Sequence, residues 1–202
     1  MRSTFSTTLH PYRQTGCLIV LLGALSCSES DPEIIGGSDL ERLDISQLQP
    51  LADAGDADAQ FALGMIHTAG DDVPQDLTTA LAWMRRAAEQ NHLQAQYELG
   101  RFHTRQGPRQ DFAEAVKWLR RSAERGYPRA QLTLGMLYAA GQGVEQDMAE
   151  AYAWVSLAEQ AGDEMAGATI QQIADVLRDD ELARAVTLAY DYQRRYRTSV
   201  KQ

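Results

Sequence analysis

Histidine is the first residue type to test for chemistry, because it is a common metal ligand and general base. The chain has four histidines. His67 and His103 lie 36 residues apart, and Tyr138 follows at the corresponding position 35 residues later. A packing role explains all three residues at once. The chain also lacks a His-Glu-x-x-His pattern or another ligand cluster with useful spacing, so we expect no metal site.

Three aspartates, Asp53, Asp56 and Asp58, have some of the alternation found in calcium-binding loops. An EF-hand loop also needs an acidic residue at its twelfth place. That place is Gly64 when counting starts at Asp53, and His67 when it starts at Asp56. We therefore interpret these aspartates as turn residues and as the first residues of a helix.

Serine nucleophiles are equally poorly supported. Ser46, Ser122 and Ser156 have no lysine three places later, as a Ser-x-x-Lys enzyme requires. There is no Gly-x-Ser-x-Gly motif and no phosphate-binding loop of the Walker type. We expect no catalytic residue and no cofactor, and we predict that the protein is not an enzyme.

The charge balance narrows the class of partner. The chain has 19 Lys and Arg against 28 Asp and Glu, for a net charge of -9, which argues against nucleic acid. Two basic pairs nevertheless recur in phase, Arg85-Arg86 and Arg120-Arg121. They form either a solvated helix face or a ridge that meets an acidic polymer or lipid head groups.

The N-terminus predicts export. Basic residues precede a short apolar run, Cys17 to Leu25, which is typical of a signal peptide over residues 1–27 and too short to span a bilayer. The stretch Ala24-Leu-Ser-Cys27 resembles a bacterial lipobox, which implies lipidation of Cys27 and an outer-membrane lipoprotein facing the periplasm. Ordinary cleavage after Ser26 would instead yield a soluble periplasmic or secreted protein. Residues 28–44 are expected to form a flexible acidic tether.

A repeat of 35 to 36 residues organises the remainder of the chain. Tryptophans, Leu-Gly pairs, Ala-Gln pairs and single aspartates all keep this spacing. The markers are Trp83, Trp118 and Trp154; Gly64, Gly100 and Gly135; Gln60, Gln96 and Gln131; and Asp76, Asp111 and Asp147.

Each repeat predicts two helices, A and B. Apolar residues recur three and four positions apart in A, and glycine follows it, as a helix C-terminus favours. The recurring aspartates stand where an N-cap of helix B belongs. Gly64, Gly100 and Gly135 fall inside helix A, where glycine costs about 1 kcal/mol relative to alanine. Because that cost recurs in phase, we expect close backbone approach between A and B, with the tryptophans filling larger gaps nearby.

These motifs closely resemble those of the Sel-one-like repeat family, relatives of the tetratricopeptide repeat. The residues that carry the resemblance are Ala-Gln-x-x-Leu-Gly, Gly-x-Gly-Val-x-x-Asp at 141–147 and Ala-x-x-Trp. The resemblance implies an all-α fold, an α-solenoid of about four helix-turn-helix repeats in a right-handed superhelix. The expected domain spans residues 45–197, with a leading half-repeat at 45–56, repeats at 57–92, 93–127 and 128–162, a diverged capping pair at 163–197 and a tail at 198–202.

A solenoid of this kind presents a concave surface lined by its A helices. We therefore predict a non-enzymatic scaffold of the cell envelope that binds a protein or peptide there, with no nucleic-acid partner and membrane contact only through Cys27. The alternative is an envelope-assembly or polysaccharide-associated lipoprotein that acts through the basic convex face. The candidate contact residues are Phe61, Met65, Tyr97, Arg101 and Met136.

Overall fold

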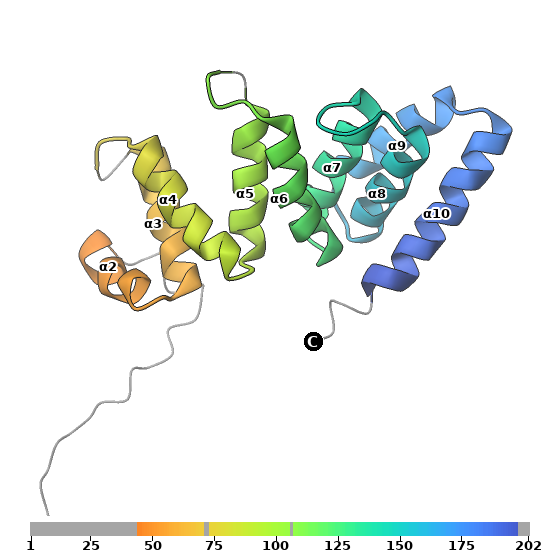
Figure 1. Ribbon diagram of the computed structural model, residues 1–202. Helices are drawn as coiled ribbons and strands as arrows, with labels where there is room; N and C mark the ends of the chain where they lie inside the picture. The colour runs from red at the N-terminus through yellow and green to blue at the C-terminus, as the bar shows by residue number, and fades with distance from the viewer. Residues whose placement is uncertain (1–43, 71–72, 106, 198–202) are drawn as a thin grey trace, which may run out of the picture. The chain divides into compact units, whose positions relative to one another are not determined.

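The computed structural model describes residues 44–70, 73–105 and 107–197, which form α-helices and connecting turns without a β-strand (Figure 1). Within these ranges no helix is both long and apolar enough to cross a membrane. The signal peptide, Cys27 and the tail at 198–202 lie outside the described residues, as does the tether except for Asp44. The helices are α2 (Ile45–Asp53), α3 (Ala57–Ala69), α4 (Leu77–Glu89), α5 (Leu93–Thr104), α6 (Phe112–Glu124), α7 (Pro128–Ala140), α8 (Met148–Gln160), α9 (Ala166–Val176) and α10 (Asp179–Arg197).

The helices pack as successive pairs. The A helices α3, α5 and α7 each lie against the B helix that follows, and each B helix also contacts the next A helix. Helix α2 packs on α3 as a lone helix in the place of a preceding B helix. This arrangement confirms the predicted all-α repeat solenoid.

The aspartates that recur in phase begin the B helices, as predicted. Asp76, Asp111 and Asp147 are the N-caps of α4, α6 and α8, and each carboxylate accepts a hydrogen bond from a backbone N–H of the first turn. The A helices α3 and α7 end at Gly70 and Gly141, which have positive φ angles of 80° and 65°. Helix α5 belongs to the shorter copy and ends instead at an extended residue, Arg105.

The glycines inside the A helices lie directly against B helices. A Cβ atom at Gly64 would lie 2.6 Å from Met84 Cγ, and one at Gly135 would lie 2.9 Å from the Ala151 carbonyl oxygen. This confirms the predicted close approach. Of the tryptophans, Trp118 and Trp154 are buried, whereas Trp83 is only half-buried.

The recurring glutamines link each A helix to the B helix before it. Gln60, Gln96 and Gln131 are buried, and their Nε2 atoms donate to the carbonyl oxygens eight residues earlier, at distances of 2.9, 2.9 and 3.0 Å. Those carbonyls lie near the C-termini of the preceding helices, where the backbone lacks intrahelical partners. The Ala-Gln motif therefore satisfies a helix end at each boundary between repeats, a role that the sequence pattern alone does not reveal.

The last two helices do not repeat the A–B arrangement. Both α9 and α10 pack on α8, and α10 makes the more extensive contact. The ring of Tyr196 stacks on that of Trp154 with 5.3 Å between centroids, and the Tyr192 hydroxyl donates to the Glu150 carboxylate at 2.9 Å. Helix α10 thus caps the array through α8 rather than by forming a fourth helix pair with α9.

Candidate protein-binding surface

The predicted contact positions Met65, Arg101 and Met136 each follow an inward-facing glycine of an A helix. One residue further along a helix turns the side chain by about 100°, so these side chains point away from the paired B helix. The Met65 and Met136 side chains are 39% and 52% exposed. Arg101 is also exposed, and its guanidinium forms an ion pair with Glu98 at 2.6 Å. We call these three residues the A-helix face.

The two aromatic candidates have different environments. Phe61 is half-buried, and its ring stacks on the His92 imidazole with 4.6 Å between centroids. Tyr97 is only 6% exposed and packs against the ring of Tyr127. Tyr97 is therefore part of the core, because the following repeat covers it, and it lies outside the A-helix face.

A shallow surface depression with a free volume of only about 20 Å³ lies beside Arg101, between the first and second repeats. Leu77, Leu81 and Met84 of α4 contribute apolar lining, while the polar lining comes from the Arg101–Glu98 ion pair of α5 and from Arg105, which follows that helix. An apolar side chain next to a carboxylate would match both parts of this lining.

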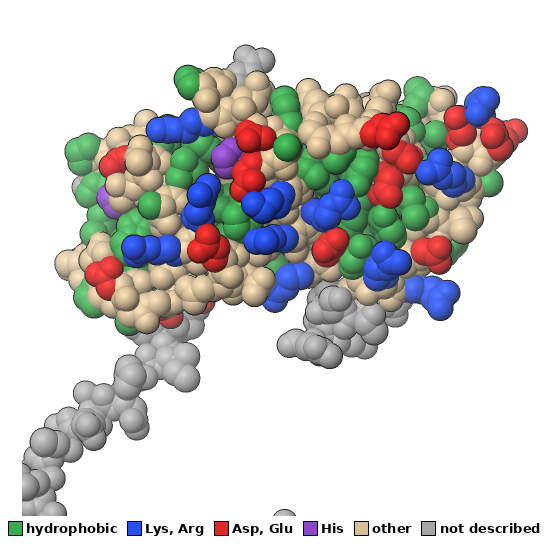
Figure 2. Space-filling model, in the orientation of Figure 1, with side chains coloured by type: hydrophobic (Ala, Val, Ile, Leu, Met, Phe, Trp, Pro, Cys, Tyr) green, Lys and Arg blue, Asp and Glu red, His purple; other side chains and the backbone are tan. Residues whose placement is uncertain are grey.

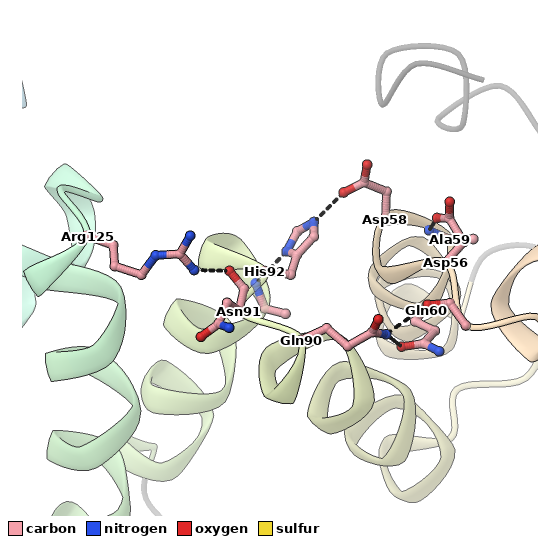
Figure 3. Close-up of polar contacts among 10 residues, drawn as sticks. Asp56, Asp58, Ala59, Gln60, Gln90, Asn91, His92 and Arg125 are labelled. Carbon is pink, nitrogen blue, oxygen red and sulfur yellow. Dashed lines mark hydrogen bonds and ion pairs between the residues drawn. The ribbon is translucent and has the colours of Figure 1, made fainter. Parts of the chain in front are cut away.

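His92 lies at the junction of the first two repeats and faces Asp58 (Figure 3). Its Nδ1 atom accepts a hydrogen bond from the Ala95 N–H at 3.1 Å and caps α5, while its Nε2 atom lies 3.0 Å from Asp58 Oδ1. This pattern assigns the proton to Nε2. Burial lowers the pKa of His92, although the Asp58 and Asp56 carboxylates oppose that shift. Protonation of Nδ1 would remove the cap.

The same close-up shows other polar contacts across repeat boundaries (Figure 3). Gln90 Nε2 donates to the Gly55 carbonyl oxygen at 2.9 Å, and Arg125 donates to the Asn91 carbonyl oxygen at 2.7 Å. No motif in the sequence predicts this junction. The one signal for it is the position of His92 immediately before helix α5, where an N-cap belongs.

The basic pairs lie on the B helices beside aromatic rings. The Arg86 guanidinium lies over the Trp83 ring at 4.5 Å, and the Arg121 guanidinium lies over the Trp118 ring at 4.9 Å. Such contacts hold a flexible cationic side chain against the surface. The tryptophans that mark the repeat therefore also orient arginines in the first two copies.

His67 and His103 lie at the C-terminal ends of α3 and α5, as their phase predicts. The His67 Nδ1 atom is buried without a hydrogen-bond partner, and the His103 Nδ1 atom lies 3.3 Å from the Arg109 carbonyl oxygen. Within the described ranges no three His, Cys, Asp or Glu side chains converge in a way that could hold a metal ion.

Comparisons with known proteins agree with this architecture. A family model described as the Sel1 (Sel-one) repeat matches residues 57–92, 93–127 and 128–163. A Sel1 repeat protein from Oxalobacter formigenes is 35% identical over 64% of this chain and 98% of its own, with a TM-score of 0.59. A protective antigen present in uropathogenic Escherichia coli strains, which displays an SLR fold, is 34% identical over 75% of this chain, with a TM-score of 0.64. The match spans only 37% of the antigen's length. No curated protein matches the chain significantly.

Proposed function

Because the chain belongs to the Sel1 repeat family, we propose that it is a non-enzymatic scaffold of the bacterial cell envelope that holds a protein or peptide partner against its A-helix face. Proteins built from Sel1 repeats generally mediate protein–protein interactions. The site on this chain and its place in the envelope are our proposals.

The exposed methionines Met65 and Met136 carry the proposal. They occupy equivalent positions on α3 and α7, and both belong to the small set of large apolar side chains that are exposed in the described part of the chain. Burying each of them against a partner would stabilise the complex by removing apolar surface from water. Methionine is flexible and polarisable, which suits it to a groove that accommodates side chains of different shape.

Arg101 adds polarity at the equivalent position of the middle repeat. Its ion pair with Glu98 is exposed on the Arg101 side, so the guanidinium can exchange that partner for a carboxylate of a ligand at little cost. An apolar side chain of the same ligand would lie against the half-buried Leu77 and Leu81 beside it. A peptide with apolar groups around one acidic residue therefore suits the A-helix face.

The proposed location depends on residues 1–27. Their basic start, apolar run and Cys27 are features of exported bacterial lipoproteins. A lipid at Cys27 would tether the repeats to the outer membrane on its periplasmic side, whereas ordinary cleavage would release them in soluble form.

Photo-crosslinking in intact cells tests both parts. We would place a photoreactive residue at position 65 or 136 of the full chain, with position 165 as a matched control, because Met165 is also exposed but lies on α9. We expect an envelope protein to crosslink at 65 and 136, and its yield to fall at least tenfold with Arg101→Glu. Crosslinking from 165 alone would contradict the A-helix face, and recovery of cytosolic proteins alone would contradict the location.

A further inference from the structure

At equivalent positions of the B helices, the first two repeats carry mostly cationic side chains, whereas the third repeat carries small or apolar ones. We compare the residue before each repeat tryptophan with the residues two and three places after it. In α8 these are Ala153, Ser156 and Leu157. In α6 they are Lys117, Arg120 and Arg121, and in α4 they are Ala82, Arg85 and Arg86. The α8 residues are all buried, with 0%, 8% and 8% exposure. Lys117, Arg121, Arg85 and Arg86 are exposed, and Arg120 is half-buried. We call these five cationic residues the basic B face.

Helix α10 is the neighbour that distinguishes α8. Helices α4 and α6 each pack between two A helices, whereas α8 packs on α7 and α9 and also makes an extensive contact with a third helix, α10. Tyr192 and Tyr196 of α10 lie against Trp154, and Tyr196 lines a surface pocket together with Leu157. The chain itself therefore shows that this side of a B helix accommodates a helix.

Three contacts fix the direction in which α10 runs along α8. Arg184 forms an ion pair with Asp147 at 2.9 Å, Tyr192 reaches Glu150, and Tyr196 stacks on Trp154. Residue numbers rise along both helices, so α10 runs parallel to α8. Polar contacts near the start of α8 and aromatic contacts near its middle together hold the docked helix.

On α4 and α6 the corresponding side carries arginine side chains that are positioned to bind an anionic group. Arg86 and Arg121 lie over tryptophan rings, and Arg120 donates to the Tyr138 hydroxyl. Among the described residues, none of the four arginines of the basic B face forms an ion pair with a carboxylate, whereas Lys117 pairs with Glu114 at 3.2 Å. A guanidinium stacked on a ring keeps its N–H edges available for a bidentate carboxylate. Figure 2 shows Lys and Arg side chains gathered across the middle of this side, over α4 and α6, with acidic side chains between them.

We infer that the basic B face binds an acidic helix of a protein partner, in the way that α10 covers the equivalent side of α8. The net charge of -9 and the interspersed acids disfavour a uniformly charged polyanion, because long-range repulsion would oppose its approach. A helix with a few carboxylates on one side avoids this repulsion. Arginine beside tryptophan is also the combination enriched at protein–protein hot spots.

The test uses the full chain and a labelled 20-residue peptide of alanine with glutamates four positions apart, whose helicity is verified by circular dichroism. A peptide of the same length and charge, with two alanines replaced by proline, serves as the non-helical control. We expect the helical peptide to raise the fluorescence anisotropy on binding, and the affinity to fall at least tenfold with Arg86→Gln plus Arg121→Gln. Both arginines are exposed and lie over tryptophan rings, so the fold is expected to persist without their charges.

The matched variant is Arg129→Gln plus Arg178→Gln, which removes the same charge from exposed positions outside the basic B face and is expected to leave peptide binding unchanged. Equal loss in both double variants would overturn the inference in favour of general charge attraction. Equal binding of the proline peptide would overturn the helical mode, and stronger binding of inorganic polyphosphate would overturn the protein partner. None of these four arginines belongs to the A-helix face, so failure of this test and failure of the proposed function can be distinguished.

Discussion

Leu119 of α6 packs its side chain directly over Gly100 of α5, so closely that a Cβ atom at position 100 would lie 2.5 Å from the Leu119 Cγ. The Ala115 carbonyl oxygen would lie 3.2 Å from the same atom. Since one of these neighbours is backbone, an added methyl group cannot be accommodated by a side-chain rotation alone.

We expect Gly100→Ala to lower the free energy of unfolding by about 1 to 3 kcal/mol from overpacking, partly offset by about 1 kcal/mol of improved helix propensity. Urea denaturation measures the change. Gly167→Ala on α9 is the matched control, because the nearest atom to its new Cβ would be Glu159 Oε1 at 3.8 Å. Equal effects at both positions would show that contact with α6 is not the reason for glycine at position 100.

The lowered pKa of His92 predicts that the stability of the fold depends on pH. Burial holds its folded-state pKa below the ordinary histidine value of 6.5, so the unfolded chain binds the proton more readily. The contribution of neutral His92 is therefore fully present above pH 6.5 and is lost as the pH falls from there towards the lowered folded-state pKa. We expect melting curves to show a decline in stability between pH 7 and pH 5.

The variant His92→Asn removes the titratable imidazole but keeps a side chain that can cap α5. Asparagine keeps a side-chain oxygen that can accept the Ala95 N–H, and loss of the cap costs about 1 kcal/mol. We expect this variant to be nearly as stable as the parent at pH 7 and to lose less stability by pH 5. A slope identical to that of the parent would assign the pH dependence to other groups.

Tyr196→Ala tests whether α10 caps the array through α8. We expect a loss of roughly 2 to 3 kcal/mol, from buried aromatic area and from the stack on Trp154. Tyr190→Ala, on the same helix but 65% exposed, should change the stability by less than about 0.5 kcal/mol. Thermal unfolding followed by circular dichroism provides both values, and similar effects would contradict the capping role.

Periodicity and local chemistry were sufficient to predict the repeated part of the fold. Asp111 begins α6 because its carboxylate accepts a backbone N–H only three residues later, an interaction that needs no distant partner. Gly100 marked a close helix contact because glycine inside a helix has a cost that only packing offsets. Both signals recur at each repeat, so the pattern alone identifies the helix pairs.

The candidate sites were less predictable, because burial depends on neighbours that the pattern does not specify. Phe61 and Tyr97 are equivalent in sequence, yet Phe61 stacks on His92 at a repeat boundary while Tyr97 is covered by the following repeat. The His92–Asp58 contact joins residues 34 positions apart that no motif connects. Met65 and Met136 remained exposed as the helix geometry led us to expect.

The sequence by itself determined the helix pairs, their caps and their close contacts, since these depend on interactions within one repeat. Only the tertiary structure decided how the array ends. A terminal repeat lacks the next neighbour that positions an internal one. Apolar and small residues on one side of α8 therefore allow α10 to pack there, while the arginines at the same positions of α4 and α6 stay uncovered within the described chain.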